Sequence, residues 1–504
     1  MLGLAGGVSL GAYILLLIVD GRRHGYVGLP GTDPANLVSG ARVAVDCVRH
    51  GTWTHCGSVA GGVPPVVSRV HAFPLLQYLP AAVLIEGGLA TLAVLHGLVW
   101  VNTFAFIGTL VCLWLVGRRV LGAGWASLLM VLGVTGPLSY YAVASLGEML
   151  ATFFMTLFVS AVLVRRPLLA ACALAVACLS KETAAPILLV VGVLAARDAH
   201  DGILPPRRWL FPLLAGAGVG TSLNMLFNVF RFGTVQNSYY LHANVNPPGI
   251  HDRLNFSLAM WFGTNTGLLF YWTLGTLLLV AVAGVVGWRV CRSPRDAHSW
   301  LPGLALLVVV AATTWGLASW WSPFGWVAWG PRLMVPFVPA FVLVGVYVVR
   351  DDINAVVRTV LRSVAGIVLV IGVATLALLP EVGVVWNSAP AAKLFYPDAR
   401  CPKWGSYNIS TESRDYYRCA RYTAWRTDRF MLPATADVAG VVPRVADGLL
   451  GGAVALLLIV SRRRIVGGSR IAAQRESAAT AAGRAARVRA ASTQRPLNSA
   501  KSGS

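Results

Sequence analysis

Apolar segments close to the roughly 20 residues needed to cross a bilayer recur along this 504-residue chain. Hydrophobic residues make up 56% of the composition and charged residues only 12%, as is typical of a polytopic membrane protein. The predicted apolar segments are residues 2–19, 70–85, 88–116, 125–142, 149–164, 168–179, 184–196, 209–230, 267–288, 301–319, 333–349, 360–379 and 449–460. We therefore predict an all-α protein with about twelve transmembrane helices.

Three of these segments need comment. Residues 2–19 precede Arg22 and Arg23 without a convincing cleavage site, so they predict a retained helix rather than a signal peptide. Residues 70–85 are interrupted by prolines and are predicted to lie in the membrane interface. Residues 168–179 and 184–196 are short for spans and predict a thin or re-entrant pair.

The formal net charge of +21 first suggests nucleic acid as a partner, but the distribution of the charge excludes it. Basic residues recur in alternate loops, which the positive-inside rule assigns to the cytoplasm together with both termini. Arg22 and Arg23 are an exception on the outer side. Residues 461–504 are rich in Ala, Ser and Arg and predict a disordered basic tail near anionic lipid headgroups.

The same topology places residues 20–87, 143–148, 180–183, 231–266, 320–332 and 380–448 outside. Cys47 and Cys56 share the first of these loops, and Cys401 and Cys419 share the last. Two close pairs in outer loops predict disulfides in an oxidising compartment. A metal site is the alternative, although neither pair has the two-residue spacing that zinc motifs favour.

Within the first outer loop, Asp33-Pro34 predicts the start of a helix that ends near Gly51. Its apolar stripe predicts a helix lying on the membrane surface. On this evidence Asp33 is either a helix cap or a functional acid.

Four other ionisable residues of the outer loops each have a structural and a functional interpretation. Glu148 can simply favour the positive end of a helix, and Lys181 can pair with Glu182 or Glu148. Arg332 can extend to the interface. An ionisable group near a bilayer is nevertheless costly and often functional, and Lys181 and Arg332 can bind a lipid-borne phosphate.

Several short motifs together resemble a known family. They are the loop acid and its helix ending in Gly-x-Trp, then HAFPLLQYLP, SYYAVASLGEM, ACLSKETAAP, NVFRFGTVQNSYY and WGPRLMVPFVP. Their order resembles the GT-C superfamily of membrane glycosyltransferases that use polyprenyl-phosphate sugars, including actinobacterial mannosyl- and arabinofuranosyltransferases. The resemblance covers roughly residues 1–380 and predicts a GT-C-like catalytic module there. It leaves an outer loop domain at 381–448, a last helix at 449–460 and the tail at 461–504.

The resemblance also implies roles for individual residues. Asp33 is the expected base, with Glu148 as a second catalytic acid. The expected ligands of the donor phosphate are Lys181, Arg332, His71 and Arg69. Independently of the resemblance, position in or beside the outer loops predicts Glu182, Arg231, Tyr239, Tyr240 and Trp329 as ligands of the sugar or acceptor. Relatives often have Asp-Glu where this chain has Asp33-Pro34, so no metal or other cofactor is expected to be required.

The implied reaction transfers a sugar, with mannose predicted, from a polyprenyl-phosphate donor to a glycan, glycolipid or protein acceptor of the cell envelope. It takes place on the extracytoplasmic face with inversion, and the enzyme is predicted to be monomeric. Arabinofuranose transfer is the alternative within the superfamily. A lipid-linked glycan polymerase of another fold, a transporter and a membrane scaffold remain as rivals, although no internal repeat typical of transporters is visible.

Overall fold

The computed structural model describes residues 33–60, 66–134, 136–143, 147–198, 206–237, 247–263, 266–320, 324, 331–350, 417, 420–421 and 424–425. Within these ranges the chain is almost entirely helical, and the one sheet has two short strands. The predicted segments 2–19, 360–379 and 449–460 and the tail lie outside the described residues, and the outer loop domain is described only at 417, 420–421 and 424–425.

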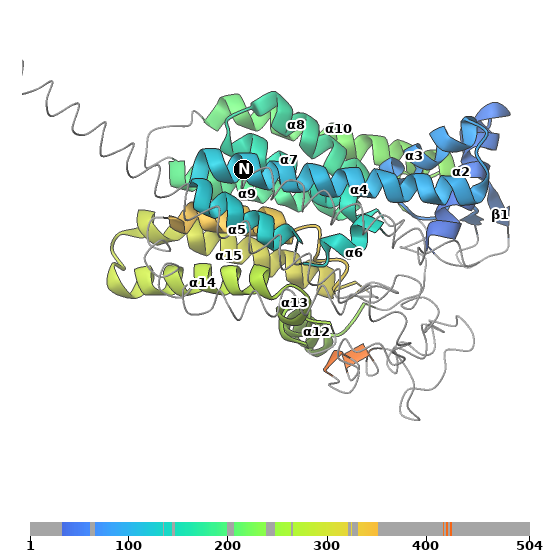
Figure 1. The fold of residues 1–504 in the computed structure, drawn as a ribbon. Coiled ribbons are helices and arrows are strands. Elements are labelled where there is room, and N and C mark those ends of the chain that lie inside the picture. The colour runs from blue at the N-terminus through green and yellow to red at the C-terminus, as the bar shows by residue number, and fades with distance from the viewer. Residues whose placement is uncertain are drawn as a thin grey trace, which may run out of the picture.

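The first outer loop forms a small helical and stranded unit. It comprises α2 (Asp33–Arg49), β1 (Ser58–Ala60), β2 (Val66–Ser68) and α3 (Leu75–Glu86). The strands are antiparallel, with Ser58 opposite Ser68. Figure 1 shows this unit gathered at one end of the molecule.

The remaining helices form the body of the protein. They are α4 (Thr91–Val116), the π-helical turn η1 (Gly117–Leu121), α5 (Ala123–Val134), α6 (Leu138–Val143), α7 (Glu148–Leu163), α8 (Pro167–Ser180), the 3₁₀ segment η2 (Glu182–Leu188), α9 (Leu189–Asp198), α10 (Pro206–Phe232), α12 (Ile250–Phe262), α13 (Leu268–Tyr271), α14 (Thr273–Arg292), α15 (Ala297–Ala318) and the helix Val338–Arg350.

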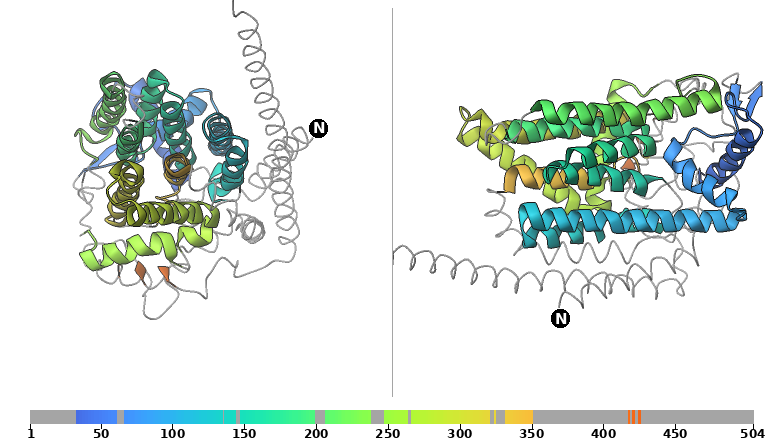
Figure 2. Two further views of the ribbon diagram at one scale, coloured as in Figure 1. Left: turned by 90° about the vertical axis from the view of Figure 1, so that its left-hand side faces the viewer. Right: turned by 90° about the horizontal axis from the view of Figure 1, so that it is seen from above.

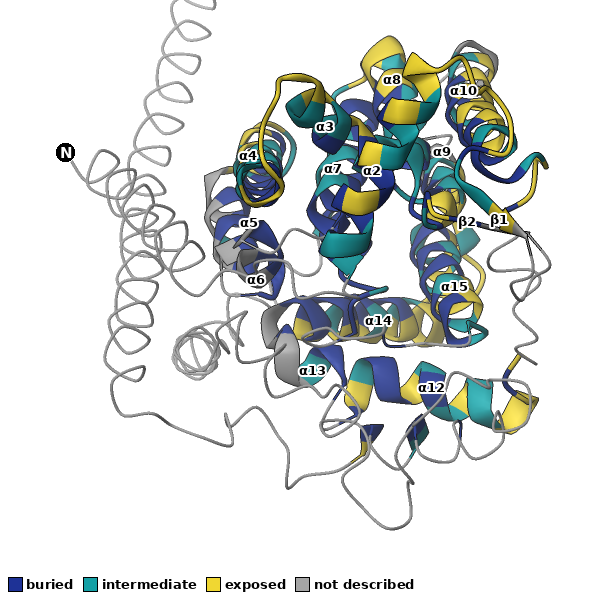
Figure 3. Ribbon diagram, turned by 90° about the vertical axis from the view of Figure 1, so that its right-hand side faces the viewer, coloured by how far each residue is buried: buried dark blue, intermediate teal, exposed yellow. Residues whose placement is uncertain are grey.

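Most of these helices run side by side with their long axes roughly aligned (Figure 2), whereas α12 lies across that direction (Figures 1 and 3). α4 packs on α7, α7 on α8 and α8 on α10, while α14 packs on α15 and α15 on α9. α2 and α3 pack on each other, and α3 also packs on the start of α4. The first outer loop is thereby held against the ends of α4, α8 and α10.

Four described helices are long and apolar enough to cross a bilayer. They are Thr91–Leu121, Trp209–Phe232, Gly275–Arg292 and Ala297–Ala318. The protein is therefore an all-α polytopic membrane protein. The predicted pair 168–179 and 184–196 is short in the structure too, because α8 ends at Ser180 and the 3₁₀ segment η2 precedes α9.

The prediction of one continuous helix over residues 125–142 is wrong, because α5 ends at Val134 and α6 begins at Leu138. Pro137 lies at the break, where it lacks an amide donor and clashes with the preceding turn. The indole Nε1 of Trp272 donates to the carbonyl oxygen of Leu132 over 2.9 Å and so satisfies an acceptor at the interrupted helix end.

The same tryptophan also marks a second break. Residues 267–288, predicted as one span, form α13 and α14 with Trp272 between them in a non-helical conformation. Trp272 therefore lies at the break between α13 and α14 and also bonds to the end of α5. The apolar runs 125–142 and 267–288 show neither break.

The helix α12 was not predicted, since it falls inside the outer loop assigned to residues 231–266. Its buried residues are Phe256, Ala259 and Met260, a helical spacing that the sequence does contain. It follows Pro248 and Gly249, which end the preceding loop.

Two hydrophobic cores support this arrangement. The larger fills the bundle. The smaller lies beneath the first outer loop, where Leu37, Val38 and Ala41 of α2 pack with Tyr78 of α3 and Phe227 of α10. The apolar stripe of α2 is therefore used largely inside the protein, although Val48 at its end is exposed. Figure 3 shows the exposed residues gathered on outward faces such as those of α8 and α10.

The predicted disulfide between Cys47 and Cys56 is confirmed, and it ties the end of α2 to the segment leading into β1. Cys112, Cys172, Cys178 and Cys291 are free and lie in helices. Cys401 and Cys419 lie outside the described residues, so their pairing stays a prediction.

α8 and α10 approach closely because α10 presents glycines to the backbone of α8. A Cβ built on Gly216 would lie 2.3 Å from the carbonyl oxygen of Ala171, and one on Gly220 would lie 2.3 Å from that of Ala175. Gly218, between them on another face, has open space around it. The contact therefore depends on two of the three glycines.

We expect Gly220→Ala to lower the melting temperature of the detergent-solubilised protein, because overpacking against backbone typically costs about 1–3 kcal/mol. Gly218→Ala is the matched control, since it meets no neighbour and adds helix propensity. Its melting temperature should be unchanged or higher. Equal melting temperatures for the two variants would show that α8 and α10 do not pack in this way.

Candidate functional site

The centre of the candidate site is one arginine shared by two acids from distant parts of the sequence. The Nη1 of Arg332 donates to Oδ2 of Asp33 over 2.6 Å, and its Nε donates to Oε1 of Glu148 over 2.6 Å. Arg332 and Glu148 are buried, with 8% and 5% of their surfaces exposed, and Asp33 is half-buried. The three residues are far apart in sequence and meet only through the fold.

Local structure explains how each of the three is presented. Asp33-Pro34 begins α2, and Glu148 begins α7, where its carboxylate lies near the positive end of the helix. Arg332 follows Pro331 in a run of turns before the helix Val338–Arg350, and its backbone amide donates to the carbonyl oxygen of Phe324. Burial opposes the charge of Arg332, but Glu148 and Asp33 outweigh it and raise the pKa of the guanidinium. Arg332 is thus a fixed cation.

Lys181 adds a second cation to this place. Its backbone is extended between α8 and η2, and this break between the two helices places its side chain near Glu148 and Arg332. Burial, with a smaller contribution from the charge of Arg332, lowers the pKa of Lys181 to about 8 against the opposing effect of Glu148. Lys181 is therefore protonated at neutral pH but loses its proton at mildly alkaline pH.

His71 lies beside Asp33 from the segment before α3. Its ring stacks on that of Phe73, with centroids 4.9 Å apart. Burial lowers the pKa of His71, and the charge of Arg231 lowers it as well, against the opposing effect of Asp33. A largely neutral ring at pH 7 can offer one N–H as a hydrogen-bond donor but carries no full positive charge.

Asp33, His71, Glu148, Lys181 and Arg332 together are called the polar cluster below. Glu148 Oε2 is buried without a hydrogen-bond partner among the described residues. Two further residues border the cluster and were missed by the sequence analysis. Tyr141, fully buried on α6, acts electrostatically on Arg332, and Gln77 donates from Nε2 to the carbonyl oxygen of Ser180 over 3.0 Å.

Gln77 also packs against Gly147, where a Cβ would lie 2.1 Å from the Gln77 amide carbon. It therefore touches the residues directly before both Glu148 and Lys181. The one signal for it in the sequence is its position as the polar residue in the apolar run FPLLQYLP.

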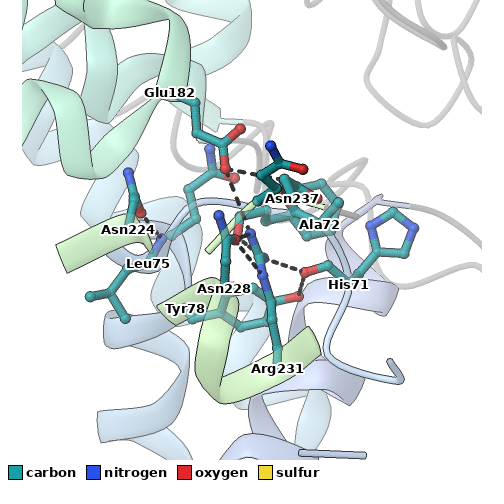
Figure 4. A network of polar contacts seen from close by, with 12 residues as sticks. His71, Ala72, Leu75, Tyr78, Glu182, Asn224, Asn228, Arg231 and Asn237 are labelled. Atoms are coloured by element: carbon teal, nitrogen blue, oxygen red, sulfur yellow. Dashed lines mark hydrogen bonds and ion pairs between the residues drawn. The ribbon is translucent and has the colours of Figure 1, made fainter. Parts of the chain in front are cut away.

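Two of the remaining predicted ligands border the polar cluster, since Arg231 donates to the carbonyl oxygen of His71 and Glu182 follows Lys181. Arg231 is fully buried, and Glu182 accepts a hydrogen bond from Asn237 over 3.1 Å and lies 3.6 Å from Arg231. Figure 4 shows these residues around the segment that carries His71. Arg69 is exposed, and its backbone amide donates to the carbonyl oxygen of Gly57. Tyr239, Tyr240 and Trp329 lie outside the described residues.

Within the described part of the chain, no group of three or more His, Cys, Asp and Glu side chains is placed to hold a metal ion. The two acids of the polar cluster instead share the guanidinium of Arg332. This describes the resting arrangement of the acids, and the expectation that no metal or other cofactor is needed stays a prediction.

No protein-family model and no curated protein matches the chain at a significant level. Two solved structures do match, both of ArnT from Cupriavidus metallidurans. The structure bound to undecaprenyl phosphate has 18% sequence identity and a TM-score of 0.45, covering 93% of this chain and 79% of that chain. The apo structure has 17% identity and a TM-score of 0.43, covering 90% and 76%. Likeness at this level assigns neither a family nor a function to this chain.

We expect Arg332→Gln to destabilise the protein, because it leaves Glu148 as a buried and poorly compensated charge. Breaking a buried ion pair in this way costs on the order of 3 kcal/mol, and Lys181 offsets part of it. Glu148→Gln in the same background should recover much of the loss. Thermal unfolding followed by tryptophan fluorescence measures both effects.

Arg49→Gln is the matched control, since it breaks an ion pair of similar length with Glu86 in which both side chains are about half exposed. It should leave the melting temperature nearly unchanged. If Arg332→Gln behaves like Arg49→Gln, the buried pairing in the polar cluster is not the one described.

Proposed function

We propose that this protein is a GT-C-type membrane glycosyltransferase that moves a sugar, with mannose favoured, from a polyprenyl phosphate to a cell-envelope acceptor. The acceptor is a glycan, glycolipid or protein, and transfer takes place on the extracytoplasmic face. One observation carries the proposal: the polar cluster brings together two acids, two cations and a histidine from five separate segments.

The residue types suit the chemistry of such a donor. In the reaction, the acceptor hydroxyl oxygen bonds to the anomeric carbon while the bond from that carbon to the phosphate oxygen breaks. The hydroxyl proton passes to Asp33, and polyprenyl phosphate leaves with the bonding electron pair. A single displacement of this kind inverts the anomeric centre.

Lys181 is the favoured ligand of the leaving phosphate. Arg332 is already neutralised by two carboxylates, whereas Lys181 has no ion pair within the described ranges. Its ammonium group therefore has donors for phosphate oxygens, and a cation placed there stabilises the charge that develops as the bond breaks. His71 adds one neutral hydrogen-bond donor from the opposite segment.

The two acids divide the work in this proposal. Glu148 holds Arg332 through Oε1, and its unpartnered Oε2 is available to a sugar hydroxyl. Asp33 holds Arg332 through Oδ2 and keeps Oδ1 for the acceptor proton. An incoming phosphate also competes for Arg332, which links arrival of the donor to release of the base.

The direct test is transfer of radiolabelled sugar by the purified protein in liposomes, with decaprenyl-phosphate-linked mannose and arabinofuranose tested in parallel. We expect transfer from the mannose donor to an envelope acceptor fraction. Transfer from the arabinose donor alone would correct the sugar and keep the reaction class. Transfer from neither donor, by a protein that is folded and inserted, would overturn the proposal.

The lowered pKa of Lys181 makes a separate prediction. Since kcat/KM reports the free enzyme, kcat/KM for the donor should fall above about pH 8, where Lys181 loses its proton. Arginine stays protonated at these pH values, so Lys181→Arg should remove this fall even if the overall rate is lower. A fall that persists unchanged in Lys181→Arg belongs to another group.

A further inference from the structure

We propose that Arg231 is a positioning residue that fixes the His71 segment against the polar cluster, rather than a ligand of the sugar or acceptor. This inference rests on the proposed function for its kinetic consequences. It replaces the ligand role predicted for Arg231 from the sequence, and it assigns a matching positioning role to its partners Glu182 and Asn237.

The contacts of Arg231 carry the inference. Its Nη1 donates to two carbonyl oxygens of the segment, those of His71 over 2.8 Å and Phe73 over 2.5 Å. Its Nε and Nη2 donate to Oδ1 of Asn228, one turn earlier on α10. The side chain has no exposed surface, so a sugar cannot reach a guanidinium whose donors already face the chain itself.

The neighbouring carbonyl is held as well. Asn237 donates from Nδ2 to the carbonyl oxygen of Ala72, so three consecutive carbonyls, from His71 to Phe73, all accept from side chains of α10 and the residues after it. The hydroxyl of Tyr78 also donates to the His71 carbonyl, and Asn224 accepts from the Leu75 amide. Figure 4 shows these bonds converging on the segment.

The same network of contacts extends to the two residues that flank Lys181. Glu182, the next residue, accepts from Asn237 and lies 3.6 Å from Arg231. Gln77, just beyond the segment, donates to Ser180, the residue before Lys181. The backbones that carry His71 and Lys181 are thus tied together on both sides of the lysine, which fixes the separation of two groups proposed to face one phosphate.

Arginine is suited to this place in a way that lysine is not. The planar fork can reach two carbonyls and an amide oxygen at once, whereas an ammonium group is a single point. The guanidinium carbon of Arg231 lies 4.7 Å from the ring centroids of both Phe227 and Phe232, which fixes its plane. Lysine would keep the charge but lose the fork.

The test is Arg231→Lys in the donor transfer assay, with the double variant Arg231→Lys/His71→Ala. We expect the single variant to lose roughly tenfold or more in donor kcat/KM with little change in the acceptor KM. In the His71→Ala background the same substitution should cost less than about threefold, because its effect passes through His71. Equal losses in the two backgrounds would overturn the positioning role.

Arg289→Lys is the matched control, since Arg289 of α14 also donates from Nη1 to a backbone carbonyl, that of Ser299 on α15. It should leave donor kcat/KM unchanged even where stability falls.

Hydrogen–deuterium exchange separates this inference from the proposed function. Peptides covering residues 71–77 should exchange faster in Arg231→Lys and not in Arg289→Lys, whether or not sugar is transferred. Unchanged exchange there would show that Arg231 does not fix the segment.

Discussion

The site depends on the ion pairs that Arg332 makes with Asp33 and Glu148. Charges taken out of water are costly, so two acids and an arginine can share a largely buried place only if each carboxylate meets the guanidinium. These ion pairs bring together the start of α2, the start of α7 and the turns before the helix Val338–Arg350. The helix breaks near α6 and after α8 bring Tyr141 and Lys181 to the same region.

The surrounding structure keeps that point in place. The small core under α2 and the disulfide between Cys47 and Cys56 hold the first outer loop together as a unit. Arg231, Asn237 and Asn224 then fasten this loop to the end of the α10 region. The loop that carries the proposed base is thus attached by buried polar contacts, which specify one geometry where apolar packing alone would allow several.

Sequence reasoning found the residue types that gather here, because acids and cations near membrane depth are rare enough to identify one by one. It also found the first disulfide and most helices, whose apolar runs are long. It could not foresee that Arg332 pairs with both acids, since residues 33, 148 and 332 meet only in three dimensions. The breaks at Pro137 and Trp272 were missed because hydropathy averages across them. For Arg231 the sequence predicts a ligand where we propose a positioning residue, because its sequence neighbours do not show the carbonyls to which it donates.

The central claim is that Asp33 acts as a base on the acceptor hydroxyl, and the most direct measurement is the turnover of Asp33→Asn in the transfer assay. Asparagine keeps the size of the side chain and can still accept a hydrogen bond from Arg332, but an amide is not a useful base at neutral pH. We predict a folded protein that binds donor normally while kcat falls roughly a hundredfold or more. Near-normal kcat with normal donor binding would contradict the account and leave Asp33 with a structural role only.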